Sequence, residues 1–492
     1  MSPKEPCEIA IIGAGFAGIA LAVKLREAGI EDFTILERAA DLGGVWRDNT
    51  YPGCACDVPS QLYSFSFAPN PNWSHTFGKQ AEILAYIKTV ADSYGVMPHV
   101  RFNNEVLEAL WDDADTCWVL RTNAGTITAK VLVCAAGVYG QAKYPDIPGR
   151  DSFAGKAFHS LHWDHDHDLT GERVAVLGTG ASAVQIVPEI APAVRRLLVF
   201  QRSAPWLLPR MDRQTSSVER ALLRRVPGVG KLIRGFYYSA LEGFGLVGFV
   251  DNRFRYPYEL LGRFQLRRQV RDRRLRNTLT PDYMIGCKRA IFADSYLPAL
   301  TRDNVDVITA GIKEILPHSI LTRDGVEHQV DTIVYATGFV APPEVYDRIR
   351  STGGHSFLEL YAKRPQSYLG VTVAGFPNFF TALGPYGAGG NQSAIYFIEA
   401  QVRYIAAAIT TMRRDAITRV EVRADVQDEF LDTMDRRSED SVWLTGGCAH
   451  SYYFTDDGRN AGLYPGWSFQ YASRTKHFDR DDYAVTVGEV GR

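Results

Sequence analysis

The stretch EIAIIGAGFAGIALAVKLREAG, residues 8–29, carries the main fold signal of this sequence. It begins with an apolar run typical of a buried parallel strand, continues through Gly13, Gly15 and Gly18, and ends with apolar residues at helical spacing. In this pattern the first glycine permits a tight turn, the second lets the backbone approach a pyrophosphate, and the third lets helix and strand pack closely. The stretch predicts a dinucleotide-binding fold, with a glycine-rich turn in an unrelated α/β fold as the alternative.

A carboxylate follows this motif at the spacing that a dinucleotide site requires. The second apolar segment, FTILER, carries Glu37 near its end, about twenty residues beyond the glycines. We expect Glu37 to hydrogen-bond a ribose hydroxyl and to repel a 2′-phosphate. The first site should therefore bind FAD or NAD and reject NADP.

A second copy of the pattern occupies residues 173–190, RVAVLGTGASAVQIVPEI, with Gly178, Gly180 and Ala183 at the three key positions. Its following segment, RLLVFQRS, ends with Arg202 and no acidic residue, and a guanidinium there could hold a 2′-phosphate bidentately. This copy should prefer NADPH. Two such sites imply that electrons pass from a nicotinamide to a flavin, within an α/β fold that has two Rossmann-like dinucleotide-binding domains.

Composition narrows the class of protein further. The 492 residues are 46% hydrophobic with a formal net charge of -2, so we expect no nucleic-acid partner. The odd number of cysteines, seven, argues against a disulfide-stapled secreted fold and favours a reducing compartment. The longest near-apolar stretch, residues 236–250, is too short to span a bilayer and contains Glu242. We expect a cytoplasmic protein without a transmembrane segment.

A sequence fingerprint lies between the two glycine motifs. It consists of Phe153, Gly155, His159, Trp163 and Asp164, in the spacing FxGxxxHxxxWD. This pattern resembles that of type I Baeyer-Villiger monooxygenases. A second pattern of that family is also present as Gly43-Gly44-x-Trp46, Tyr51-Pro52-Gly53 and Asp57. The Trp-Asp ending argues against the related flavin-containing monooxygenases that oxygenate nitrogen and sulfur.

The resemblance implies a reaction and two cofactors. NADPH would reduce FAD, the reduced flavin would add O2 to give a C4a-peroxyflavin, and attack on a ketone would insert one oxygen atom to give an ester or lactone. Such chemistry concentrates negative charge and needs a fixed cation in a dry site. The resemblance also implies that Trp46 helps to bind FAD, and that His159 organises the linker between the two nucleotide domains without transferring protons.

The segment MIGCKRAIF, residues 284–292, resembles the family segment that carries an active-site arginine, here Arg289. The resemblance implies that Arg289 stabilises the peroxyflavin, that Asp57 orients Arg289, and that Lys288 reaches the NADP 2′-phosphate. An arginine stays charged in any environment. The alternatives are an ordinary surface Lys-Arg pair and an aspartate that serves a turn or a helix N-cap.

Two groups of residues allow other chemistry. His159, His162, His165 and His167 could bind Zn or Cu, but no further ligand set is evident, so we expect no metal and interpret the last three as a solvated polar turn. Cys54 and Cys56 could form the redox disulfide of a reductase, but a bridge across one residue is strained. An N- or S-oxygenating flavoprotein, an NADPH oxidase or reductase, and a non-catalytic flavoprotein are the competing functions.

The expected organisation divides the chain into five parts. They are residues 1–150 for the first part of the FAD domain, 151–210 for the linker and first part of the NADPH domain, 211–280 for a helical insertion, 281–340 for the second part of the NADPH domain, and 341–492 for the remaining FAD domain with substrate-pocket loops. Segments 131–140 and 332–339 should be the crossings between the two domains. The arginine-rich insertion could be a solvated helical face, part of the substrate entrance, or a weak membrane-surface contact.

Overall fold

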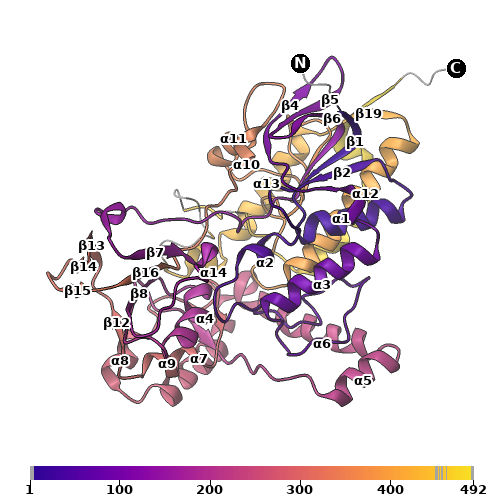
Figure 1. Cartoon of the computed structure of the whole chain (residues 1–492). Helices are drawn as coiled ribbons and strands as arrows, with labels where there is room; N and C mark the ends of the chain where they lie inside the picture. Colours follow the sequence, from indigo (N-terminus) through magenta and orange to yellow (C-terminus); the bar gives the residue numbers. More distant parts are fainter. Residues whose placement is uncertain (1–4, 449–452, 454, 456–457, 461, 489–492) are drawn as a thin grey trace.

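Two β-sheets, set apart in Figure 1, form the framework of the computed structural model. The structure describes residues 5–448, 453, 455, 458–460 and 462–488. Part of the expected C-terminal pocket loops, between residues 449 and 461, lies outside the described residues. The fold is α/β with two separate sheets, each built around parallel strands followed by helices, as the sequence predicts.

Eight strands form the first sheet: β1 (Glu5–Ile12), β2 (Phe33–Leu36), β3 (Val100–Arg101), β4 (Val106–Asp112), β5 (Cys117–Thr122), β6 (Gly125–Cys134), β17 (Ile349–Arg350) and β18 (Phe379–Thr381). Their order is β17-β4-β5-β6-β1-β2-β3, with β18 also paired to β6. The strands on either side of β1 are parallel to it, which brings their carboxyl ends to one edge. Helices α1 (Phe16–Glu27), α3 (Gln80–Ser93) and α12 (Ala394–Arg414) pack into the core of this sheet.

Five parallel strands form the second sheet: β7 (Lys156–His159), β8 (Arg173–Leu177), β9 (Arg196–Phe200), β12 (Val305–Ile308) and β16 (Thr332–Tyr335). Their order is β12-β9-β8-β16-β7. Helices α4 (Ala181–Ile190) and α9 (Tyr296–Leu300) pack against it. An antiparallel meander of β13 (Ile312–Leu316), β14 (Ser319–Thr322) and β15 (Glu327–Gln329) and a short pair of β10 (Leu207–Leu208) and β11 (Ile291–Phe292) complete this half.

The chain crosses between the two sheets twice, after β6 and after β16. These are the two places where the sequence predicts crossings. After the second crossing, two antiparallel strands and four helices return to the first half: β19 (Ile417–Val422), β20 (Tyr483–Val487), α10 (Val345–Arg348), α11 (Phe357–Lys363), α13 (Ala424–Ser438) and α15 (Ser468–Arg474). The short helix α14 (Val442–Thr445) packs instead against Trp206, Val247 and Tyr283, in the other half.

The predicted helical insertion is present between β10 and β11. It contains α5 (Ser217–Arg225), α6 (Val229–Glu242), the π-helical turn η4 (Leu246–Val250), the short turn η5 (Asn252–Phe254), α7 (Arg255–Gln269) and α8 (Arg273–Thr278). These helices lie along the lower edge of Figure 1.

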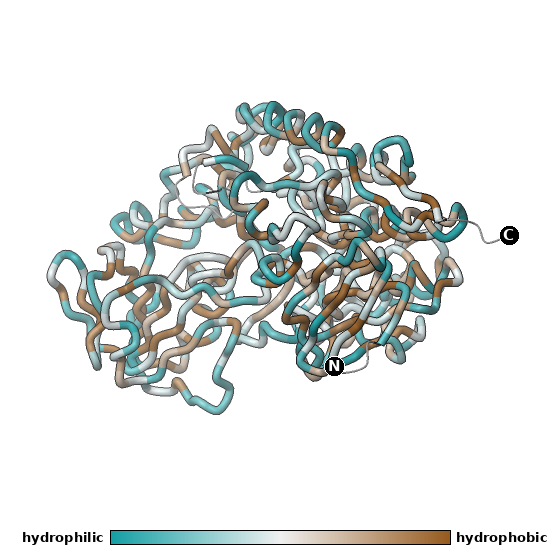
Figure 2. Tube along the Cα trace, turned by 90° about the horizontal axis from the view of Figure 1, so that it is seen from above, coloured by the Kyte–Doolittle hydropathy of each residue, from teal (hydrophilic) through white to brown (hydrophobic). Residues whose placement is uncertain are grey.

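Hydropathy follows the layers of the fold. Figure 2 shows brown, apolar segments in the strands near the N-terminus, and their central residues are fully buried. Among the described residues, no helix is both long enough and apolar enough to cross a membrane.

Candidate active site

The first glycine turn leaves one face open. Gly13 adopts a φ of +102°, and a Cβ there would lie 2.8 Å from the carbonyl oxygen of Ala135. A Cβ at Gly18 would lie 2.0 Å from the carbonyl oxygen of Gly13, so helix α1 can approach β1 only without a side chain there. At Gly15, by contrast, a Cβ would meet only the Gly44 Cα, at 3.9 Å. The protein could therefore accommodate a Cβ at Gly15, and the backbone at the N-terminus of α1 faces an open space.

Glu37 lies directly after β2 and is only 4% exposed. Its carboxylate accepts hydrogen bonds from the Ala14 amide at 2.9 Å, from the Ala39 amide at 3.0 Å and from Arg47 Nη1 at 2.9 Å. These bonds fix the carboxylate beside the glycine turn. A carboxylate has about four acceptor positions, so capacity for a ribose hydroxyl remains.

The second glycine turn repeats this geometry. A Cβ at Gly178, where φ is +116°, would lie 2.4 Å from the carbonyl oxygen of Ala336, whereas a Cβ at Gly180 would meet no atom of the described residues within 4 Å. Ala183 is fully buried at the third position, on helix α4. The open face again lies at a helix N-terminus that follows a parallel strand.

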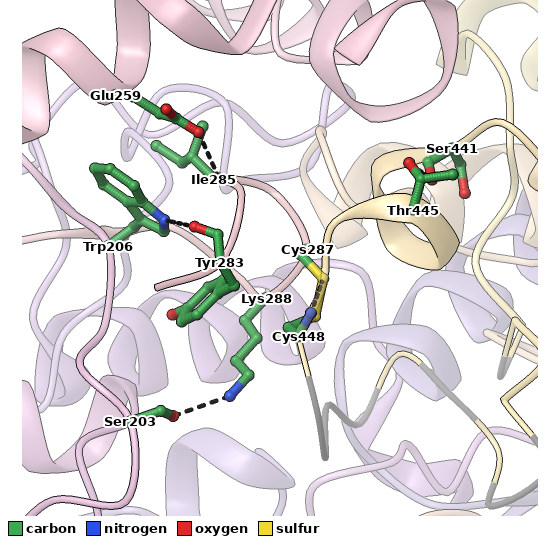
Figure 3. Close-up of a disulfide and its surroundings, with 10 residues drawn as sticks. All are labelled: Ser203, Trp206, Glu259, Tyr283, Ile285, Cys287, Lys288, Ser441, Thr445 and Cys448. Carbon is green, nitrogen blue, oxygen red and sulfur yellow. Dashed lines mark hydrogen bonds between the residues drawn. A yellow bond between two sulfur atoms is a disulfide. The ribbon is translucent and has the colours of Figure 1, made fainter. Parts of the chain in front are cut away.

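Two cations gather near the end of β9. Lys288 Nζ donates to Ser203 Oγ at 2.9 Å and lies 4.8 Å from the centre of the Tyr283 ring (Figure 3). Burial lowers the pKa of Lys288 and repulsion by Arg202 lowers it further, while Asp282 partly offsets this effect. Arg202 is exposed. Lys288 and Arg202 repel one another, and a phosphate bound between them would offset that repulsion.

Arg289 and Asp57, separated by 232 residues in the chain, form an ion pair. Arg289 Nε donates to Asp57 Oδ2 at 2.8 Å and a terminal nitrogen donates to the other carboxylate oxygen, so the contact is bidentate. The Asp57 side chain is 16% exposed and that of Arg289 is 42% exposed. The guanidinium is thus oriented from one side while part of it stays accessible.

Trp46 is buried on the short helix α2 (Val45–Asp48), next to the Gly43-Gly44 turn. Its Nε1 donates to the Tyr63 hydroxyl at 2.9 Å, and the two rings meet edge to face. The indole is therefore held in one orientation within the core around α1.

Contacts with neighbouring residues explain why the fingerprint positions carry these residue types. The Phe153 ring covers Gly155, where a Cβ would lie 2.8 Å from the ring and 2.2 Å from the carbonyl oxygen of Asp331. Trp163 packs edge to face on Phe158, with 5.1 Å between ring centres. Asp164 accepts from the Asp166 amide at 3.1 Å.

His159 is fully buried at the end of β7. Its Nδ1 accepts from the Leu161 amide at 3.1 Å, and its ring makes edge contacts with Tyr144 and Phe339. Burial lowers the pKa of His159 to about 4, so the imidazole is neutral near pH 7. Tyr144 lies in the connection that follows β6 and Phe339 in the one that follows β16, so the histidine packs where both connections meet.

The other histidines of this segment do not converge. His162 and His165 are exposed, with a hydrogen bond of 2.8 Å between His165 Nε2 and Thr50 Oγ1. His167 differs from the expected solvated turn because it is half-buried, with Nε2 3.2 Å from Glu172 and 3.0 Å from Thr332. Over the part of the chain that the structure describes, no group of three or more metal-ligating side chains is present.

The comparisons with known proteins agree with this geometry. The family model "Pyridine nucleotide-disulphide oxidoreductase" matches residues 10–226. A Baeyer-Villiger monooxygenase from Streptomyces coelicolor is 43% identical over 98% of this chain and 93% of that protein, and one from Pseudomonas aeruginosa is 42% identical over 98% and 92%. This chain belongs to the Baeyer-Villiger monooxygenases.

Solved structures of this monooxygenase family have the same fold over their entire length. OTEMO in complex with FAD and NADP superimposes with a TM-score of 0.89 at 27% identity, covering 98% of this chain and 100% of that one. Cyclohexanone monooxygenase from Rhodococcus sp. Phi1, bound to NADP+, gives a TM-score of 0.88 at 26% identity, covering 99% and 100%. The predicted family is confirmed.

One disulfide of this Baeyer-Villiger monooxygenase is not predicted by its sequence. Cys54 and Cys56 are free thiols, so they do not form the bridge of a reductase. Cys287 and Cys448 instead form a disulfide, with 6.0 Å between their Cα atoms (Figure 3). Cys287 directly precedes Lys288, so the disulfide links the segment that carries Lys288 to the residues that follow α14. Its partners are 161 residues apart, and the sequence carries no local signal for their pairing.

From the sequence alone we assign no role to two further polar side chains, Ser203 and Asn391. Ser203 directly follows Arg202, and its hydroxyl accepts a hydrogen bond from Lys288. Its position next to Arg202, shortly after β9, is the sequence signal that could have identified it. Asn391 lies in the glycine-rich loop before α12, and neither polar atom of its buried amide has a hydrogen-bond partner among the residues that the structure describes. A buried amide without partners is costly, so this monooxygenase has a polar group there that a ligand could satisfy.

Proposed function

We propose that the chain is an NADPH- and O2-dependent FAD enzyme that inserts one oxygen atom next to a ketone carbonyl and releases an ester or lactone. The observation that carries this proposal is the bidentate Asp57–Arg289 pair in a chain of this family. The pair provides a permanently charged, oriented donor group. An enzyme that moves an oxygen anion needs such a group where negative charge develops.

The two glycine turns fit the two cofactors, because Gly15 and Gly180 leave open the space that a pyrophosphate needs. We assign residues 1–150 and 341–492 to FAD, with 151–210 and 281–340 assigned to NADPH. The FAD set is Gly13, Gly15, Gly18, Glu37, Trp46 and Asp57. The NADPH set is Gly178, Gly180, Ala183, Arg202 and Lys288. Bound FAD, after reduction by NADPH, would supply the chemistry that activates O2.

The roles of this chain's own residues follow from their environment. Arg289 would stabilise the negative charge on the oxygen that is transferred to the ketone, with Asp57 as its positioning residue. His159 would hold together the connections that follow β6 and β16, through Tyr144 and Phe339, and it would not transfer protons because its pKa lies at about 4. Phe153, Gly155, Trp163 and Asp164 would fix the linker around it.

A panel of linear, cyclic, aryl and steroid ketones tests the proposal. We expect at least one ketone to accelerate NADPH oxidation by the FAD-loaded protein and to yield an ester or lactone in proportion to the NADPH consumed. Parallel assays with a sulfide and with a tertiary amine that yield sulfoxide or N-oxide, while no ketone yields an ester or lactone, would instead assign the chain to N- or S-oxygenation. Hydrogen peroxide as the only product would assign it to NADPH oxidation.

Arg202 should discriminate between the two nicotinamide cofactors. Arg202→Ala removes one of the two cations proposed for the 2′-phosphate, so KM for NADPH should rise about 10- to 100-fold, as expected for a charge-assisted hydrogen bond. KM for NADH should change less than about twofold, since NADH has no such phosphate. Steady-state kinetics with both cofactors measure the ratio. An equal loss for both would show that Arg202 does not bind the phosphate.

We also propose that the protein works in the cytoplasm. Cys7, Cys54, Cys56, Cys117 and Cys134 are free thiols, which supports a reducing compartment. The Cys287–Cys448 bridge is an exception, and Cys287 is fully shielded from solvent.

A further inference from the structure

Exposed apolar side chains are concentrated in the insertion. Of the nineteen large hydrophobic side chains that are exposed among the described residues, twelve lie between positions 211 and 264. They are Met211, Val218, Leu222, Val226, Leu232, Phe236, Val250, Phe254, Tyr256, Leu260, Leu261 and Phe264. Scattered exposed hydrophobics need no explanation, but a group of this kind indicates an interaction surface.

Helix α6 turns its apolar side chains outward. Leu232 and Phe236, four residues apart and therefore on one face, are 76% and 69% exposed. The opposite side of the same helix is anchored, because Tyr238 and Leu241 pack against the core of the first sheet and Glu242 is buried. The apolar face of α6 is therefore a fixed feature of the surface.

Helix α7 has the same arrangement. Leu260 and Phe264 are 66% and 63% exposed. On the other side, Gly262 lies against Trp206, and the Gln265 side chain donates to the Ala293 carbonyl at 2.6 Å. Figure 1 shows α5, α6 and α7 along one edge of the molecule.

Basic residues surround these apolar side chains. Residues 211–280 contain fifteen Lys and Arg but six Asp and Glu, whereas the whole chain has a formal charge of -2. Lys231 is exposed beside Leu232, and Arg267 and Arg268 are exposed one turn beyond Phe264. Two copies of so basic a face would repel one another, so the charge favours an anionic partner.

We propose that α5, α6 and α7 seat this protein on the surface of an anionic phospholipid bilayer. Leu232, Phe236, Leu260 and Phe264 enter the interface between headgroups and acyl chains, while the flanking arginines and Lys231 contact lipid phosphates. Apolar and basic residues on one helical surface are the two contributions that interfacial helices combine. This binding goes beyond the proposed oxygenation and does not depend on it.

Co-sedimentation of the FAD-loaded protein with vesicles tests the proposal. One set of vesicles is phosphatidylcholine alone, and the other contains about one third phosphatidylglycerol, both at about 0.1 M salt. We expect binding to the anionic vesicles and little binding to the neutral ones. Leu232→Ser/Phe236→Ser should weaken binding by about tenfold or more, because two apolar side chains no longer leave water. The double variant Arg267→Ala/Arg268→Ala should weaken it and reduce its salt dependence.

Three results would overturn the proposal. The first is absence of binding to anionic vesicles at low salt. The second is equal binding by Leu232→Ser/Phe236→Ser, together with tight binding to heparin, which would assign the basic face to a soluble polyanion. The third is a dimer in solution that this variant abolishes, which would assign the face to a second copy of the chain. Flavin content and thermal unfolding of each variant verify that it is folded.

Discussion

Arg289→Ala should lower the rate of ester formation by about 10²- to 10³-fold, the loss expected when one charge-stabilising donor is removed from an active site. NADPH oxidation should continue and yield hydrogen peroxide, because Arg289 is not among the residues assigned to the cofactor. The product ratio of ester to peroxide measures this uncoupling directly. Arg289 is also 42% exposed, so its removal should leave the core intact.

Two further variants separate charge from orientation at this position. Arg289→Lys keeps the charge but cannot make the bidentate contact that Nε and a terminal nitrogen make with Asp57, so it should retain an intermediate rate. Asp57→Ala keeps the guanidinium but removes its positioning residue, and it should lower the rate of ester formation more than it raises KM for the ketone. If Arg289→Ala formed the ester at the unchanged rate, that result would contradict the proposed role of Arg289.

Gly15→Ala should yield a folded protein without bound FAD. Gly15 has a φ of -87°, which alanine adopts readily, and its Cβ would meet only the Gly44 Cα at 3.9 Å. The unfolding free energy of the apoprotein should therefore change by less than about 1 kcal/mol, whereas the new methyl group occupies the space proposed for the pyrophosphate. Flavin absorbance per protein, together with urea unfolding, measures both quantities.

Gly180→Ala is the matched control, because it makes the same change in the second glycine turn, where a Cβ would meet no atom of the described chain within 4 Å. It should retain FAD and lose affinity for NADPH. Gly18→Ala should behave differently from both and destabilise the fold, because its Cβ would lie 2.0 Å from the Gly13 carbonyl oxygen. Full FAD occupancy in Gly15→Ala would contradict the cofactor assignment of the first turn.

Local patterns made most of the fold predictable. Each glycine turn is encoded within about twenty residues, and strand, turn and helix are read from neighbouring side chains. The crossings and the insertion also follow from breaks in the strand and helix pattern. The short β10–β11 pair and the β13–β15 meander have no comparable signature, since such short strands depend on partners elsewhere in the chain.

The site was less accessible to sequence reasoning, because its contacts join distant segments. Asp57 and Arg289 are 232 residues apart, and only resemblance to a family suggested that they meet. Neither a sequence pattern nor the family resemblance indicated the Cys287–Cys448 bridge or the Lys288–Ser203 contact, and only the structure shows them. Pairing over such separations is decided by the packing of the two halves, which residue periodicity does not encode.

Isotopically labelled O2 gives the most direct measurement of ketone oxygenation. The FAD-loaded protein is incubated with NADPH, labelled O2 and the ketone that most accelerates NADPH oxidation, and the product is analysed by mass spectrometry. We expect one molecule of ester or lactone, carrying one labelled oxygen atom, for each NADPH consumed. Ketone recovered unchanged, with the label appearing only in hydrogen peroxide, would contradict ketone oxygenation.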